Sequence, residues 1–139
     1  MSNENVKKWP EFKSQYENYI DGKWTAPVQG KYFDNISPIN GKVFTKVAHS
    51  TKEDLELAVN AADKAFKTWG KTSATERSII LNKIADRMEQ NLDYLATVET
   101  IDNGKAVRET LNADIPLGID HFRYFAGVIR AEEGSHVEL

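Results

Sequence analysis

The sequence predicts an α+β fold, in which a short β-meander precedes about four helices. Two patterns carry this prediction. The first fifty residues alternate short extended stretches with turn residues, whereas apolar residues after Ser50 recur every three or four positions. A third observation is composition: apolar residues make up 40% and charged residues 28% of the 139 residues, which is close to globular usage and permits a core.

The predicted meander follows a polar arm, residues 1–15, which shows no period and which we expect to be flexible. Residues 16–139 then form the ordered part. Asp21-Gly22 separates two short β-prone stretches and is typical of a type I′ hairpin turn. The sequence predicts two further extended stretches, at residues 32–36 and 43–47, and a turn between them at residues 38–41.

Helical periodicity begins after Ser50. Ser50 with Glu53, or Thr51 with Asp54, can form a capping box that starts a first helix. The apolar residues of this helix share one face, and we expect Trp69 on that face, like Trp24 of the hairpin, to fill the core. The residues of this face are Leu55, Val59, Ala62, Phe66 and Trp69.

Three further helices are predicted. Ser73 with Glu76 forms a second capping box. A third helix ends at Asn103-Gly104, since both residues tolerate positive φ. The fourth should span about 106–129 and contains Pro116, which lacks a backbone donor and therefore predicts a kink or a restart.

Composition excludes several function classes. The net charge of −3 gives no basic excess for nucleic acid, and no apolar run is long enough for a membrane span, so we expect a cytoplasmic protein. The chain has no cysteine, which removes thiolate nucleophiles and thiolate metal ligands. No glycine-rich dinucleotide loop is present. We therefore assign no catalytic residue and no cofactor-binding residue to this chain.

The remaining candidates have simple structural interpretations. The three histidines, His49, His121 and His136, show no metal-ligand spacing, and we expect His121 to be a packed or surface residue. The aromatic residues at 122, 124 and 125 could line a ligand pocket, but core packing is the favoured interpretation.

Six motifs in a fixed order resemble the NAD(P)-dependent aldehyde dehydrogenases. The most specific is Glu99-Thr100-Ile101-Asp102-Asn103-Gly104-Lys105, and Ser37 stands where the family usually has asparagine. The Arg108-Glu109 pair and residues 130–135 resemble bacterial betaine- or acetaldehyde-type members most. The other motifs lie at 19–24, 36–43, 61–69, 76–88 and 121–127.

The resemblance implies that residues 16–139 are the N-terminal portion of the α/β NAD(P)-binding domain. In the complete enzyme, a cysteine thiolate would attack an aldehyde, NAD or NADP would accept hydride, and water would release a carboxylic acid. The chain alone would be inactive, and its partners would be the rest of the enzyme chain and further copies in a homo-oligomer. The alternative is a stand-alone helical interaction or oligomerisation module derived from that fold.

Two lesser roles follow from the same resemblance. Many members of the family hold a structural Na⁺ or K⁺ through backbone oxygens beside the turn at residues 38–41 and at the aspartate of the most specific motif. The positions in this chain are Asn35, Ile36 and Asp102. The fourth helix usually lines the aldehyde entrance, where Ala113 and Leu117 occupy the corresponding positions. Pro116 departs from many members.

Overall fold

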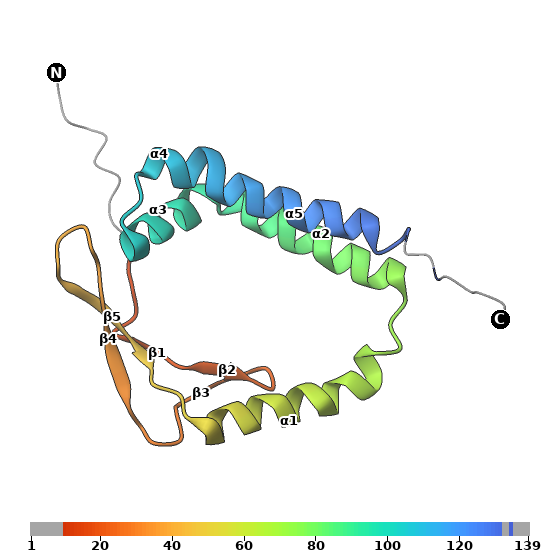
Figure 1. Ribbon diagram of the computed structural model, residues 1–139, viewed down its shortest axis with the longest axis horizontal. Coiled ribbons are helices and arrows are strands. Elements are labelled where there is room, and N and C mark those ends of the chain that lie inside the picture. The colour runs from red at the N-terminus through yellow and green to blue at the C-terminus, as the bar shows by residue number, and fades with distance from the viewer. Residues whose placement is uncertain (1–9, 132–133, 135–139) are drawn as a thin grey trace, which may run out of the picture.

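The computed structural model describes residues 10–131 and residue 134. Short strands come first and helices follow, which confirms the predicted α+β order (Figure 1). The strands are β1 Gln15–Tyr16, β2 Asn18–Ile20, β3 Lys23–Thr25, β4 Tyr32–Ile36 and β5 Val43–Ala48. The helices are α1 Lys52–Trp69, α2 Ala74–Gln90, α3 Leu92–Asn103, α4 Val107–Glu109 and α5 Ile115–Val128, with a π-helical turn, η1 Thr110–Asp114, before α5.

The strands divide between two sheets. β5 lies between β1, to which it is parallel, and β4, to which it is antiparallel, while β2 and β3 form a separate hairpin. Positive φ angles at Asp21 (51°) and Gly22 (76°) confirm the predicted hairpin turn. Gln15, the last residue of the arm expected to be flexible, already pairs with Lys46, and residues 1–9 of that arm lie outside the described residues.

The predicted helix boundaries hold because they depend on local chemistry. The Thr51 amide donates to the Asp54 carboxylate over 2.8 Å, which selects the second of the two candidate boxes for α1. The Ser73 amide likewise donates to Glu76 over 2.8 Å at the start of α2. Gly104 ends α3 with a φ of 81°.

The predicted fourth helix is interrupted by the π-helical turn η1. The Ile115 amide donates to the Thr110 carbonyl, five residues back instead of four. Pro116 follows directly after this hydrogen bond. In an α-helix, a proline ring clashes with the carbonyl four residues earlier, which is here the carbonyl of Asn112. A wider turn relieves this clash. The expected kink is therefore a local widening of the helix.

The main packed region lies between α2 and α5, which run side by side (Figure 1). The buried Ser78 hydroxyl donates to the Ala126 carbonyl over 2.6 Å. Arg123 of α5 donates to the carboxylates of Asp86 and Glu89 on α2, at 2.8 and 2.7 Å. These contacts fix α5 against α2 in one rotational setting.

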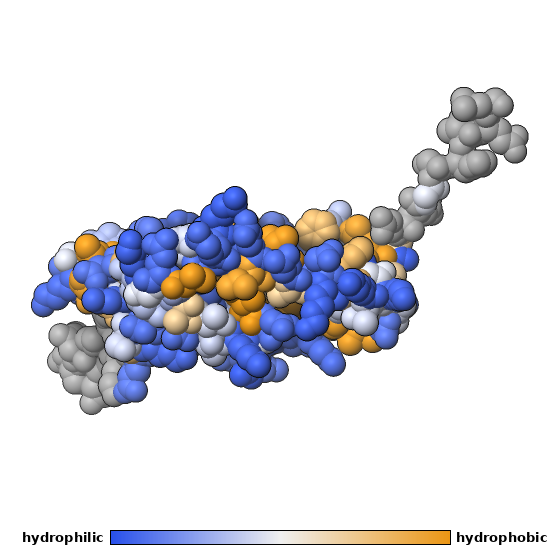
Figure 2. Space-filling view, turned by 90° about the horizontal axis from the view of Figure 1, so that it is seen from below, coloured by the Kyte–Doolittle hydropathy of each residue, from blue (hydrophilic) through white to orange (hydrophobic). Residues whose placement is uncertain are grey.

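Two predictions about the core are wrong. Trp24 and Trp69 are 56% and 45% exposed, and Tyr124 and Phe125 are exposed as well. The α1 face to which Trp69 belongs is open, because β2 is the main neighbour of α1 in the described part of the chain. Helix α1 lies at the bottom of Figure 1. Figure 2 views the molecule from that side and shows apolar patches among hydrophilic surface. Within the described residues, no helix is both long and apolar enough to cross a membrane.

Candidate functional site

The turn after β4 contacts the end of α3. The Asn35 side-chain amide donates to the Asp102 carboxylate over 2.7 Å, although 67 residues separate them in the sequence. The Ser37 side chain is fully buried, and its hydroxyl donates to the Ile101 carbonyl over 2.6 Å. The structure therefore joins the two segments in which the resemblance placed a monovalent cation.

Glycine is required where these segments meet. Gly104 has a φ of 81°, and a Cβ atom built on it would lie 2.9 Å from Cγ of Pro38. Only a residue without a side chain permits both the left-handed backbone and this close approach. Ile36 lies beside the contact but is half exposed, and it pairs with Val43 at an irregularity in the β4–β5 ladder.

The oxygen atoms at this junction are of the type that hard cations bind. One Asp102 carboxylate oxygen and the Ile101 carbonyl already accept hydrogen bonds from the neighbouring turn. Among the described residues, no group of three or more His, Cys, Asp or Glu side chains could hold a metal ion. A cation here would therefore depend mainly on backbone oxygens, with Asp102 as the charged ligand.

A second buried cluster lies where the chain turns from α3 into η1. Thr110 is fully buried, and its hydroxyl donates to the Ala96 carbonyl over 2.9 Å. The Thr100 hydroxyl lies 3.0 Å away on the other side. The sequence shows no sign of this cluster or of the Ser37 contact, because a single threonine or serine carries no signal of a long-range partner.

The two predicted entrance residues lie beside this cluster. Ala113 belongs to η1 and Leu117 to the first turn of α5, and both are exposed. Lys105 donates to the Asp114 carboxylate over 2.7 Å, and this hydrogen bond, helped by the nearby Glu99 and Glu109 carboxylates, raises the pKa of Lys105. An ion pair thus closes η1 on its exposed side.

The starts of α1 and α2 are both capped by a carboxylate. A pyrophosphate at a helix N-terminus needs free backbone N–H groups. At α1, the Asp54 carboxylate accepts from the amides of Thr51 and Val28, both over 2.8 Å, and these bonds lower the pKa of Asp54. At α2, the bond from the Ser73 amide lowers the pKa of Glu76 in the same way. Each helix start therefore carries a negative charge beside its N-cap residue, which opposes the binding of an anion such as pyrophosphate.

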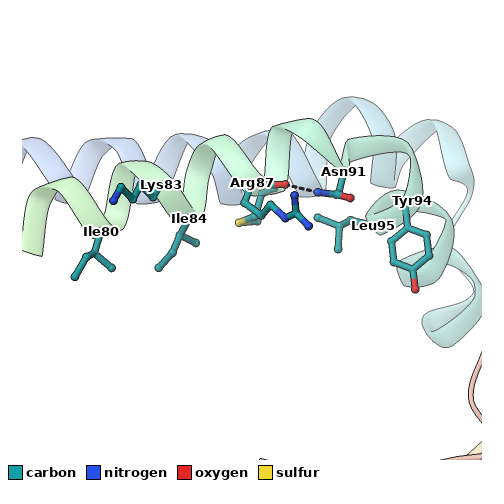
Figure 3. A pocket seen from close by; sticks show the side chains of 8 residues that line it. Ile80, Lys83, Ile84, Arg87, Asn91, Tyr94 and Leu95 are labelled. Atoms are coloured by element: carbon teal, nitrogen blue, oxygen red, sulfur yellow. Dashed lines mark hydrogen bonds between the residues drawn. The ribbon is translucent and has the colours of Figure 1, made fainter. Parts of the chain in front are cut away.

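A shallow groove of about 460 Å³ lies along α2 and the start of α3. Ile80, Ile84 and Tyr94 point away from α5 in Figure 3, and Lys83 and Arg87 add positive charge to the groove. Its lining contains no carboxylate and no histidine, and the hydroxyl of Tyr94 has no such general base among the lining residues.

Comparison with solved structures defines the class of protein. The chain superposes on PnpE, crystallised in complex with nicotinamide adenine dinucleotide, with a TM-score of 0.86 and 37% identity, covering 90% of this chain and 26% of that one. The described residues therefore have the fold of about a quarter of a protein that was crystallised with this dinucleotide. The aldehyde dehydrogenase family profile matches residues 24–139, and the chain belongs to the aldehyde dehydrogenase family.

Bacterial relatives are similar along most of the chain. An aldehyde dehydrogenase of Deinococcus radiodurans is 68% identical over 124 residues, which is 89% of this chain and 24% of that protein. A long-chain-aldehyde dehydrogenase of an Acinetobacter species is 66% identical over 128 residues, 92% of this chain and 25% of that protein. The chain thus spans about a quarter of the length of the curated relatives it matches.

Proposed function

We propose that this chain is the N-terminal part of an NAD(P)-dependent aldehyde dehydrogenase that oxidises an aldehyde to a carboxylic acid. The observation that supports the proposal most strongly is the family match over residues 24–139, in a chain that spans a quarter of its relatives. The rest of the enzyme chain would supply the nucleophile and hold NAD or NADP, which accepts the hydride when bound.

In this proposal the described residues have supporting roles. Ala113 and Leu117 contribute to the aldehyde entrance, while Asn35, Ile36 and Asp102 hold a structural Na⁺ or K⁺. The contact between Asn35 and Asp102 supports the second assignment. The 139-residue chain by itself is not catalytic, because its sequence contains no cysteine. The betaine or acetaldehyde type remains a prediction from the resemblance.

The proposed partners are the rest of the enzyme chain and further copies in a homo-oligomer, in the cytoplasm. The alternative function, a helical interaction or oligomerisation module, is favoured by one observation. The apolar face of α1 is open, with Leu55, Val59 and Phe66 all more than half exposed. An enzyme chain would cover this face with its own remaining residues, whereas a module would cover it with another protein.

A chimeric enzyme tests the proposal. The matching quarter of the Deinococcus aldehyde dehydrogenase is replaced by this chain, and NADH formation is followed with aldehydes of different length. We expect the chimera to be active and the 139-residue chain alone to remain at the no-protein blank. Turnover by the chain alone would refute its assigned inactivity. A folded but inactive chimera would support the interaction module instead.

A further inference from the structure

The π-helical turn η1 joins two segments that are fixed to different neighbours. On its N-terminal side, the buried Thr110 hydroxyl donates to the Ala96 carbonyl of α3 over 2.9 Å. On its C-terminal side, α5 is held against α2 by Arg123 and by the Ser78–Ala126 hydrogen bond. Neither anchor can rotate without breaking its own buried or charged contacts.

The segment between the anchors has one residue more than an α-helix would use. The Ile115 amide reaches back five residues to the Thr110 carbonyl, and an α-helix would reach back four. Each α-helical residue turns the chain by about 100°. If η1 closed into an α-helix, the residues after it would therefore rotate by about that angle relative to α3.

Thr110 is the buried attachment of this turn to α3. The Thr110 hydroxyl lies 2.9 Å from the Ala96 carbonyl, 3.0 Å from the Thr100 hydroxyl and 3.1 Å from the Val107 carbonyl of the preceding turn. Two of these three partners, Ala96 and Thr100, belong to α3. The Lys105–Asp114 bond lies on the exposed side of the turn, where an ion pair holds geometry weakly. Pro116 already disfavours the α-helical register at the C-terminal side of η1. The hydroxyl of Thr110 is the polar group that can hold the π register from the opposite side, at α3.

We propose that Thr110 is a positioning residue that holds η1 in its π register and thereby sets where Ala113 and Leu117 stand. If these two residues line the aldehyde entrance, which rests on the proposed function, Thr110 also determines which aldehydes pass. It does so without touching the substrate, because it is fully buried against α3.

Three variants separate positioning from general stability. Thr110→Val keeps the shape of the side chain but loses the hydroxyl, whereas Thr110→Ser keeps the hydroxyl. Thr97→Val is the matched control, since Thr97 on α3 also donates a hydroxyl hydrogen to a carbonyl, that of Asp93, over 2.7 Å and away from η1. Should Thr110→Val fail to fold, Thr100→Val weakens the same cluster and leaves Thr110 in place.

The first measurement is the labelling of a single introduced cysteine, which is specific because the chain has no cysteine of its own. A single cysteine at 113 or at 117 reports the exposure of that position through its rate of maleimide labelling. Losing a buried hydroxyl-to-carbonyl bond should shift the balance between the two registers by about tenfold. We expect Thr110→Val to change the ratio of the two labelling rates, and Thr110→Ser and Thr97→Val to leave it unchanged. If the ratio of labelling rates is unchanged in Thr110→Val, the proposal is overturned. If Thr110→Val does not fold, the same test applies to Thr100→Val.

The second measurement is made in the chimeric enzyme, as the ratio of kcat/KM for a long and a short aldehyde. A change in Thr110→Val that Thr110→Ser does not show supports the selectivity role. Altered labelling with an unaltered ratio means that Thr110 holds the turn but does not select aldehydes, which overturns that role. If the parent chimera is folded and inactive, the proposed function fails, while the labelling result still decides whether Thr110 positions η1.

Discussion

Helices α1 and α2 start in the same way but differ in how many of their side chains are buried. They have 18 and 17 residues, and each starts with a capping box. α2 buries Ser78 and Ala85 against its neighbours, but the only buried residue of α1 is Asp54. The comparison shows that the residues next to a helix start are enough to place that start, whereas burial of the apolar face requires a partner elsewhere in the fold.

The largest effect should come from enlarging a packed alanine. Ala85 on α2 is fully buried, and Ala85→Leu should lower the free energy of unfolding by about 1–3 kcal/mol through overpacking. Ala62→Leu on α1 is the control, because Ala62 is exposed and a surface change should stay within about 0.5 kcal/mol. Urea titration followed by circular dichroism measures both. Equal losses would show that the α1 face is packed in solution.

A second pair of variants tests how firmly the β4 turn is joined to α3. Gly104→Ala should cost about 1–2 kcal/mol for its left-handed backbone, and the contact with Pro38 should add to this cost. Gly22→Ala is the matched control, since Gly22 has a similar φ of 76° and no heavy atom within 4 Å of a built Cβ. The difference between the two unfolding free energies isolates the contact. If that difference is zero, Pro38 moves aside freely.

The local features of this fold could be predicted from the sequence. Asp21-Gly22 defines its own turn, Ser73 and Glu76 lie three residues apart, and Gly104 ends a helix through its own backbone. The exposure of Trp69 could not be predicted, because an amphipathic pattern shows that a face is apolar but does not identify what covers it. Pro116 predicts an irregularity at η1, but the buried hydrogen bond from Thr110 to Ala96 of α3 has no signal in the sequence.

The candidate site also contains residues that could be identified before the structure and residues that could not. The resemblance, and not residue chemistry, led to Asn35 and Asp102, and the structure then brought their side chains within 2.7 Å. Ser37 was noted only as a departure from the family pattern, yet it is fully buried and bonded to Ile101. A contact across 64 residues depends on the whole fold and has no local signature.

The open face of α1 predicts self-association of the 139-residue chain. Phe66 is 65% exposed, so Phe66→Ser should change the free energy of unfolding by less than about 0.5 kcal/mol and should reduce association. Sedimentation velocity across a range of micromolar concentrations measures the association. Ile119→Ser is the contrasting variant, because Ile119 is buried and its loss should lower stability instead. A parent chain that stays monomeric at every concentration contradicts the prediction.

The smallest effect concerns Asp54, the single side chain that α1 buries. Hydrogen bonds from the amides of Thr51 and then Val28 lower its pKa below the ordinary value of 3.8. A carboxyl with a lowered folded pKa contributes stability above its ordinary pKa, and this contribution is lost as the pH falls through the folded pKa. The start of α1 should therefore loosen only in acid, below the pH at which an unbonded aspartate titrates.

Nuclear magnetic resonance of the Val28 amide between about pH 6 and pH 2 measures this change directly. Its shift should move with a midpoint below 3.8 in the parent chain, and this titration should disappear in Asp54→Asn. Glu76→Gln removes the corresponding carboxylate from α2 and should leave the Val28 titration unchanged, because Val28 donates to Asp54. A Val28 midpoint at or above 3.8 would mean that Asp54 does not hold α1 to the loop before β4. The start of α1 would then be as free as its apolar face, and the contrast with α2 would extend to the helix start.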